Sequence, residues 1–223
     1  MPGEPWQITR DMFLDEAEVG RLLRYVRDRA SEADRDNPTP HVDRLVVELL
    51  LYSGLRPSEF CRLAVQDAVL TEDESFFRVT EGAGETRVVF IPRWLNRDIA
   101  RYVKSIRLQY LDVGNGPDKP SSPLILNERG RAYDRTALYR RVTRILTAAG
   151  VGDRASVQLL RHTYGYLAYK RTGGNLLFVQ RQLGHAHPMV TAIYAQFVEE
   201  NPTNLADAVA FAERPTPRKK ERR

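Results

Sequence analysis

Cysteine is almost absent from this sequence: Cys61 is the single thiol in 223 residues. One thiol cannot form an internal disulfide, so a hydrophobic core has to hold the fold together, as is usual in a reducing compartment. Cys61 lies within an apolar helical pattern, and we interpret it as a buried structural thiol. The sequence also lacks an apolar run of about 18 residues and a signal-peptide pattern, which predicts a soluble cytoplasmic protein with no membrane partner.

Motifs of several common enzyme classes are missing as well. The glycines at 82 and 84 have no Gly-Lys-Ser or Gly-Lys-Thr ending after them, so they do not form a nucleotide-binding loop. No Gly-x-Ser-x-Gly sequence is present, which removes support for an esterase. The histidines at 162, 185 and 187 lack the His-x-x-x-His spacing of a helical metal site, and we predict none.

Lysine is scarce, with 5 residues against 29 arginines, and the positive charge is unevenly distributed. Residues 1–60 carry eight arginines and twelve acidic residues, a net charge of −4. Since the whole chain has a net charge of +5, residues 61–223 carry +9. A segregated basic surface fits a polyanionic partner, although a basic tail can equally serve solubility. The basic residues concentrate in the tail 218–223 and at Arg129, Arg131, Arg135, Arg140, Arg141 and Arg144.

The spacing of apolar residues predicts a mainly α-helical fold with one small antiparallel hairpin. Gly54 is expected to end one helix and Pro57 to begin the next, which places Arg56 between them. The hairpin strands are expected at 76–79 and 86–91. We expect helices at 15–29, 41–53, 57–63, 92–110, 136–149, 156–169, 175–183, 188–197 and 205–212, with loops at 30–40 and 113–123.

Four short motifs contain the side chains that cleavage of a phosphodiester requires. They are Gly-Leu-Arg-Pro-Ser-Glu at 54–59, Leu-Arg-His-Thr at 160–163, Leu-Gly-His at 183–185, and Thr191 with Tyr194. Arginine binds phosphate oxygens through a bidentate fork, and histidine donates a hydrogen bond or moves a proton. Tyrosine is a covalent nucleophile where its proton is removed or its anion is stabilised.

In this order and spacing, the four motifs resemble the catalytic domain of the tyrosine recombinase (phage integrase) family over about residues 13–211. The resemblance implies the DNA breaking-rejoining catalytic-domain fold, mainly α with a small antiparallel sheet. It divides the chain into a lead-in at 1–12, a catalytic domain at 13–212 and a basic tail at 213–223. The separate DNA-clamping domain that usually precedes the catalytic one is not expected, so the chain is either a catalytic-domain-only recombinase or a fragment.

The function implied by the resemblance is that of a site-specific DNA recombinase or integrase. Such an enzyme cuts and rejoins DNA through a 3′-phosphotyrosyl intermediate, without a metal, a nucleotide cofactor or a small-molecule substrate. The implied partners are double-stranded DNA and further copies of the chain, assembled on DNA as a tetrameric synapse. The last helix, 205–212, is expected to dock on a neighbouring protomer or, alternatively, on its own core.

The resemblance also assigns roles to residues by their positions in the motifs. Arg56 and Arg161 would clamp the scissile phosphate, and His185 would add a third hydrogen bond. Tyr194 would be the nucleophile. Glu59 would brace the first arginine, while the histidine that follows the second arginine would be structural.

Two positions depart from the family pattern. The histidine usually found three residues before the second arginine is Gln158 here, which can hydrogen-bond the phosphate but cannot take a proton near neutral pH. The hairpin at 76–92 contains no lysine, and its nearest cation, Arg87, is a poor general acid because its pKa is above roughly 12. A second hypothesis therefore stays open, a weakened relative acting as a DNA-binding accessory or regulatory protein. The chain's length and motif spacing argue against a third, a type IB topoisomerase.

Overall fold

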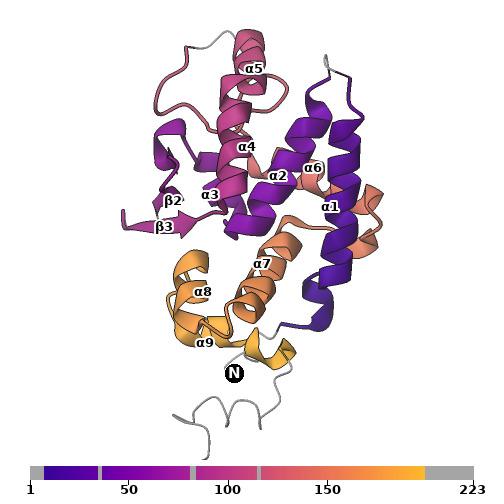
Figure 1. Ribbon diagram of the computed structural model, residues 1–223, viewed down its shortest axis with the longest axis vertical. Helices are drawn as coiled ribbons and strands as arrows, with labels where there is room; N and C mark the ends of the chain where they lie inside the picture. The colour runs from indigo at the N-terminus through magenta and orange to yellow at the C-terminus, as the bar shows by residue number, and fades with distance from the viewer. Residues whose placement is uncertain (1–7, 35–36, 81–83, 115–116, 199–223) are drawn as a thin grey trace, which may run out of the picture.

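The computed structural model describes residues 8–34, 37–80, 84–114 and 117–198 (Figure 1). The predicted last helix at 205–212 and the basic tail at 213–223 lie outside the described residues. Within the described part the fold is mainly helical with one small antiparallel sheet, as predicted. No helix of this part is long and apolar enough to cross a membrane.

The elements follow one another as helices interrupted once by the sheet. The α-helices are α1 (Glu16–Ser31), α2 (Thr39–Ser53), α3 (Pro57–Arg62), α4 (Arg93–Lys104), α5 (Ile106–Gly114), α6 (Arg135–Ala148), α7 (Val157–Arg171), α8 (Leu176–Leu183) and α9 (Pro188–Ala192). The strands are β1 (Ala68–Leu70), β2 (Ser75–Thr80) and β3 (Thr86–Phe90). Single turns of 3-10 helix lie at Arg10–Met12, Val65–Asp67, Gly152–Arg154 and Ala195–Phe197.

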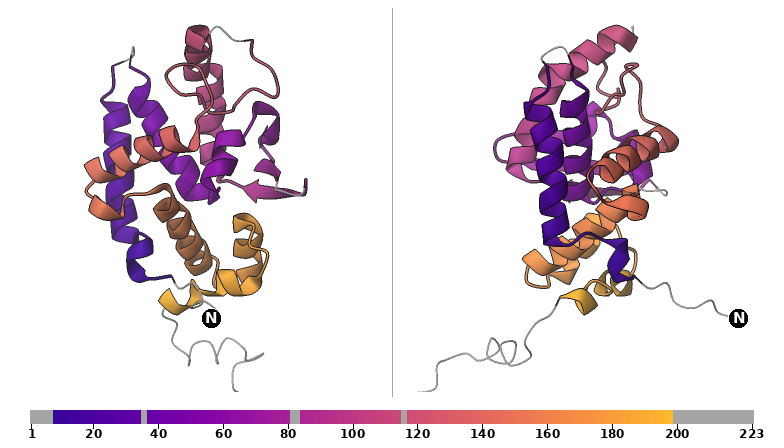
Figure 2. Two further views of the ribbon diagram at one scale, coloured as in Figure 1. Left: turned by 180° about the vertical axis from the view of Figure 1, so that it is seen from behind. Right: turned by 90° about the vertical axis from the view of Figure 1, so that its right-hand side faces the viewer.

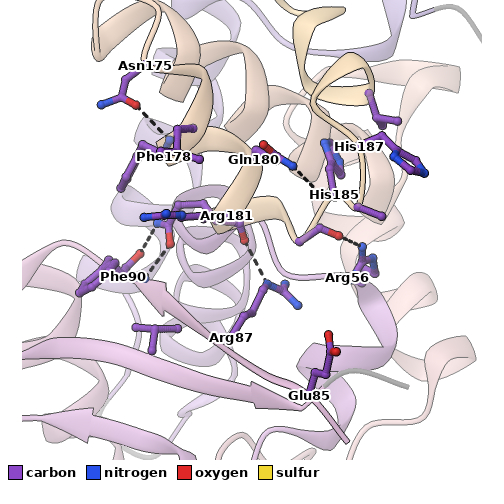
Figure 3. Close-up of a pocket in the computed structure, with 16 residues that line it drawn as sticks. Arg56, Glu85, Arg87, Phe90, Asn175, Phe178, Gln180, Arg181, His185 and His187 are labelled. Carbon is purple, nitrogen blue, oxygen red and sulfur yellow. Dashed lines mark hydrogen bonds between the residues drawn. The ribbon is translucent and has the colours of Figure 1, made fainter. Parts of the chain in front are cut away.

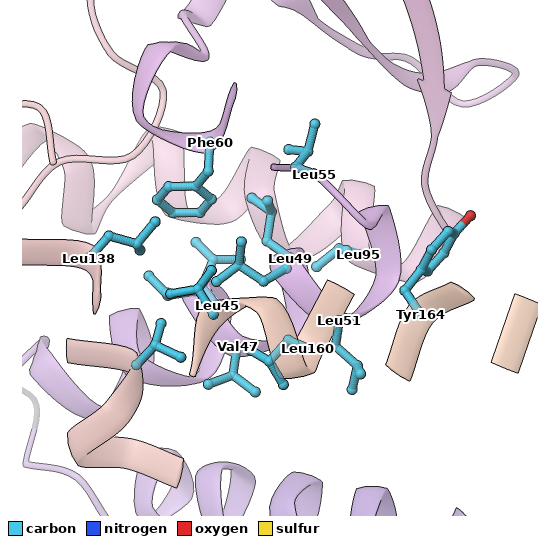
Figure 4. Close-up of a cluster of buried hydrophobic side chains, with 14 of the residues drawn as sticks. Leu45, Val47, Leu49, Leu51, Leu55, Phe60, Leu95, Leu138, Leu160 and Tyr164 are labelled. Atoms are coloured by element: carbon cyan, nitrogen blue, oxygen red, sulfur yellow. The ribbon is translucent and has the colours of Figure 1, made fainter. Parts of the chain in front are cut away.

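Helix α2 is the centre of the hydrophobic core. Leucines on different sides of this helix, such as Leu49 and Leu51, are fully buried, because α1, α4, α6 and α7 all pack against it. Figure 4 shows Leu160 of α7 and Leu138 of α6 among these side chains. Because neighbouring helices cover α2 on several sides, its last residues are held firmly in place.

The end of α2 sets the position of Arg56. Gly54 has a φ of 63°, the left-handed conformation that stops a helix, as predicted. A Cβ atom at Gly54 would lie 2.8 Å from the Leu183 side chain and closer still to the Tyr164 side chain, so a larger residue would clash with both α7 and α8. The chain then turns directly into α3, with Arg56 at its N-cap and Pro57 in its first turn.

The three strands pair in the order β1-β2-β3, all antiparallel. The predicted hairpin is confirmed as β2 and β3, whereas the three-residue β1 was not predicted. Gln182 of α8 binds the outer edge of β3: its Oε1 accepts from the Phe90 N–H and its Nε2 donates to the Phe90 carbonyl, both at 2.9 Å. This buried amide fixes α8 against the sheet.

Two predicted helices were wrong in extent. The helix expected at 92–110 breaks at Ser105, whose hydroxyl donates to the Arg101 carbonyl at 2.8 Å and competes with the helical bonds. It continues as α5 to Gly114, into the expected loop. The helix expected at 188–197 ends at Ala192, because tighter i to i+3 bonds take over around Tyr194.

Figures 1 and 2 show how these elements are distributed along the molecule. Helices α1 and α2 run side by side, with α5 at one end. Helices α7, α8 and α9 form the opposite end. The sheet faces α8, so the motif-bearing segments of the chain meet between the sheet and this lower end.

Candidate active site

Arg56 and Arg161 converge on the carboxyl end of α8. Arg56 Nη2 donates to the Gly184 carbonyl (Figure 3), and Arg161 Nη2 donates to the preceding carbonyl, that of Leu183, at 2.6 Å. Arg161 Nη1 also donates to the carbonyl of Gly54, next to the turn that carries Arg56. Residues from α3, α7 and α8 are thereby brought together, as the four motifs predicted.

Arg161 is buried, and its charge is close to that of Arg56. Burial, together with the positive charge of Arg56, lowers the pKa of Arg161 to about 10. The guanidinium still carries its full charge near neutral pH. Two adjacent positive charges with aligned donors form a suitable seat for an anion such as a phosphodiester.

Glu59 opposes this positive charge and contacts Arg56, as expected. Its Oε1 accepts from Arg56 Nη1 at 2.8 Å, and its Oε2 accepts from the Arg56 backbone N–H at 2.7 Å. Burial alone would raise the pKa of Glu59, but hydrogen bonds from Arg87 and Arg56 outweigh it and lower the pKa to about 2. The carboxylate is therefore ionised at any ordinary pH.

Arg87 of β3 is a site residue that sequence reasoning did not assign. Its Nη1 and Nη2 donate to the two oxygens of Glu59, each at 2.8 Å, in a bidentate pair. Its Nε also approaches the Gln182 carbonyl at 3.4 Å. The strand pattern could have revealed it. Arg87 lies two residues before the buried Val89, so both side chains face the core side of the sheet, and a cation there needs an anionic partner.

His185 follows the left-handed Gly184, which ends α8 with a φ of 64°. Its Nδ1 lies 2.9 Å from the Thr191 hydroxyl, and Gln180 Nε2 donates to its carbonyl at 3.0 Å. Burial, followed by the charges of Arg161 and Arg56, lowers the pKa of His185 to about 4. The imidazole is therefore neutral at pH 7, and with the Thr191 hydroxyl donating to Nδ1 it can donate a hydrogen bond from Nε2.

Tyr194 is buried, with 1% of its surface exposed, and its ring packs on α7. The hydroxyl lies 3.1 Å from His162 Nδ1. Burial raises the pKa of Tyr194 to about 12, although the charge of Arg161 acts in the opposite direction. The phenol is thus protonated and enclosed in the free protein, close enough to Arg161 for each to influence the other's pKa.

Gln158 lies on the first turn of α7, three residues before Arg161, and is exposed. Its part in the reaction stays a prediction.

A groove of about 1080 Å³ opens beside the arginine pair, between β3 and α8 (Figure 3). One end of the groove is polar, with Arg56, Arg87 and His185. The apolar side chains that line the groove are Val88, Phe90, Leu177, Phe178 and Val190, and polar residues such as Asn175 and Arg181 lie among them. Leu177 and Phe90 are more than half exposed, at 54% and 55%.

The predicted basic stretch around α6 is only partly available to a partner. Arg129 and Arg140 are exposed, but Arg141 is buried, which corrects the expectation that it belongs to a basic surface. Arg141 Nε donates to Asp43 at 2.7 Å and its Nη1 to the Tyr133 hydroxyl at 2.6 Å. This arginine therefore holds α6 against α2.

The fold is that of tyrosine recombinase catalytic domains. The crystal structure of the XerA recombinase superposes with a TM-score of 0.66 at 25% sequence identity, covering 92% of this chain and 65% of that one. A structure of the XerH site-specific recombinase bound to its difH substrate, a pre-cleavage complex, gives a TM-score of 0.69 at 21% identity, covering 94% and 56% of the two chains.

Sequence comparison leads to the family. The model described as the phage integrase family matches residues 12–200, and the chain belongs to this family. The tyrosine recombinase XerH of Campylobacter jejuni is 27% identical over 199 residues, which cover 89% of this chain and 51% of that protein. The chain thus spans about half the length of the curated relatives it matches.

Proposed function

We propose that this chain is a site-specific DNA recombinase or integrase, which cuts and rejoins DNA through a 3′-phosphotyrosyl intermediate. The observation that carries the proposal is the convergence of Arg56 and Arg161 on the end of α8, beside His185 and Tyr194. Membership of the phage integrase family and the names of the relatives support it.

The arginine pair would bind the scissile phosphate. Its N–H groups now rest on the carbonyls of Leu183 and Gly184, and a phosphate would compete with those carbonyls for the same donors. Because these donors are held in place before the reaction, they would stabilise the charge that develops on the phosphoryl oxygens in the transition state. His185 would add a third donor through Nε2.

Tyr194 would then attack phosphorus and release the 5′-oxygen. The phenol is enclosed in the free protein, so in this proposal DNA binding opens the route between the phenolic oxygen and the phosphate. Rejoining is the reverse reaction, in which a 5′-hydroxyl attacks the phosphotyrosine.

Double-stranded DNA would be the partner. Because that DNA would lie in the cytoplasm, the protein would act there too. The exposed arginines near α6, such as Arg129 and Arg140, support a polyanion-binding face. The solved XerH relative is bound to its difH substrate.

We also infer self-assembly on DNA, as a tetrameric synapse. The apolar groove beside the site could receive the segment 205–212 from a neighbouring copy, because that segment carries the apolar residues Leu205, Val209 and Phe211. Crosslinking on DNA with and without Leu205→Asp tests this. Unchanged assembly, with reduced thermal stability of the free monomer, would place the segment on its own core instead.

Cleavage can be tested without knowing the target site. The protein is incubated with a random-sequence pool of nicked DNA duplexes, which trap a covalent complex because the cut fragment diffuses away. After denaturation, protein-bound DNA is captured and sequenced. We expect a recurrent sequence attached to the wild-type protein and no adduct with Tyr194→Phe, whose DNA binding should be unchanged. Binding of DNA by the wild type without any adduct would instead favour an accessory protein.

A further inference from the structure

His162 lies against the phenol of Tyr194 in a position that its place in the motif did not predict. Its Nδ1 is 3.1 Å from the Tyr194 hydroxyl oxygen. His162 directly follows Arg161 on α7. The phosphate-binding arginine and an imidazole at the nucleophile are therefore positioned by consecutive residues of one rigid helix.

The seat of the phenol is shaped by α7 at a second point. Gly165 lies one turn after His162, on the same side of the helix, under the Tyr194 ring. A Cβ atom at Gly165 would lie 2.6 Å from the Tyr194 hydroxyl oxygen, so any larger residue would displace the ring. The phenol oxygen is thus located by two residues of α7, and its hydrogen bond to the imidazole is part of that arrangement.

The other site residues are less suited to take the phenolic proton. His185 Nδ1 is engaged with the Thr191 hydroxyl. Glu59 is bound by two arginines, which hold its pKa at about 2. Gln158 has no group that binds a proton near neutral pH.

We propose that His162 is the general base of the cleavage step and accepts the proton of Tyr194; this proposal rests on the proposed function. The phenolic O–H bond breaks and its proton passes to Nδ1, while the phenolic oxygen forms the bond to phosphorus. The P–O5′ bond breaks, and the 5′-oxygen takes a proton from a water molecule, which leaves hydroxide in the solvent. In rejoining, the 5′-hydroxyl gives its proton back to that hydroxide as it attacks phosphorus, and the imidazolium returns its proton to the departing phenolate.

The charge of the site couples this base to substrate binding. Burial, together with the positive charge of Arg161, lowers the pKa of His162 to about 4, so the imidazole is neutral and can accept a proton at pH 7. A phosphate bound at Arg161 would offset that positive charge. His162 would therefore become a stronger base once DNA occupies the arginine pair.

The test compares three variants on a nicked duplex recovered from the random pool. His162→Asn keeps a hydrogen-bond acceptor for the phenol but cannot take its proton, and His162→Ala keeps neither. His41→Asn, at the start of α2, is the matched control. Each variant is checked for thermal stability and for DNA affinity, and the single-turnover rate of adduct formation is measured. We expect a rate about 10²-fold lower for both His162 variants, with DNA affinity unchanged.

A second substrate identifies which proton His162 moves. In a duplex with sulfur in place of the bridging 5′-oxygen, the leaving thiolate needs no proton, because its conjugate acid is far stronger than an alcohol. The defect of His162→Asn should persist on this substrate. Full recovery there would assign His162 to the leaving group and overturn the proposal. A rate for His162→Asn within about threefold of the wild-type rate on the normal substrate would also overturn the proposal. The hydrogen bond would then only hold the phenol in position. Absence of any adduct with the wild-type protein would instead overturn the proposed function.

Discussion

At the scale of single residues, the pair of Glu59 and Arg87 determines how Arg56 is presented. Glu59 accepts one hydrogen bond from the Arg56 side chain and another from the Arg56 backbone N–H. Because Arg87 pairs with both carboxylate oxygens, it holds Glu59 in the position in which Glu59 binds Arg56. We regard Arg87 as a positioning residue for Arg56, the first arginine of the proposed phosphate site.

Arg87→Lys should separate charge from geometry. Lysine keeps the positive charge but loses the planar fork, so Glu59 would turn toward Arg56. We expect the rate of adduct formation to fall about tenfold, with little change in DNA affinity, as for other small displacements of a catalytic group. Arg78→Lys, on the exposed face of β2, is the control. Equal rates for Arg87→Lys and wild type would show that charge alone suffices.

Glu59 should also make stability depend on pH. Its pKa is lowered from 4.5 to about 2, so its contribution is present above pH 4.5 and is lost as the pH falls toward 2. A shift of this size corresponds to roughly 3 kcal/mol in the free energy of unfolding. Urea unfolding of wild type and Glu59→Gln at several pH values tests this. The variant should be less stable at pH 7, and the difference should shrink below pH 4.5.

At the scale of elements, the contact between α7 and Tyr194 depends on one missing side chain. Gly165→Ala would force the Tyr194 ring away from α7 and cost about 1–3 kcal/mol of stability, as overpacking of a core usually does. Gly20→Ala is the control, since a Cβ in that part of α1 meets only Arg24 at 3.6 Å and should be neutral or stabilising. Thermal unfolding and the accessibility of the tyrosine to iodination measure both effects. An unchanged melting temperature for Gly165→Ala would contradict the packing seen here.

The sequence predicted the elements whose cause is local. The apolar pattern of α2, its glycine stop and the hairpin all follow from spacing within a few residues. The strand β1 was missed because three residues are too few for a periodic signal, and the break at Ser105 depends on one hydroxyl bond. In the site, the motifs predicted that Arg56 and Arg161 would meet. The pairing of Arg87 with Glu59 in the site, and that of Arg141 with Asp43 elsewhere, could not be predicted, because each partner lies far away in the sequence.

At the scale of the whole molecule, the uneven charge should make DNA binding strongly dependent on salt. The logarithm of affinity should fall with the logarithm of salt concentration, with a slope of about −0.9 for each phosphate contact. Deleting residues 214–223, which carry all the positive charge of the basic tail, should reduce this slope and weaken binding to all sequences alike. A tail of the same composition in scrambled order is the control and should restore the slope. Fluorescence anisotropy titrations at several salt concentrations measure it, and an unchanged slope after deletion would show that the tail does not contact DNA.

The carbonyls of Leu183 and Gly184, at the carboxyl end of α8, have a further consequence. They are the negative end of a helix dipole, and they hold two guanidinium groups that would otherwise repel each other. The arginine pair is therefore already assembled in the free protein, with backbone oxygens as its acceptors. In the proposed function, DNA binding would exchange these oxygens for those of the phosphate, so little conformational entropy would be lost at the arginines.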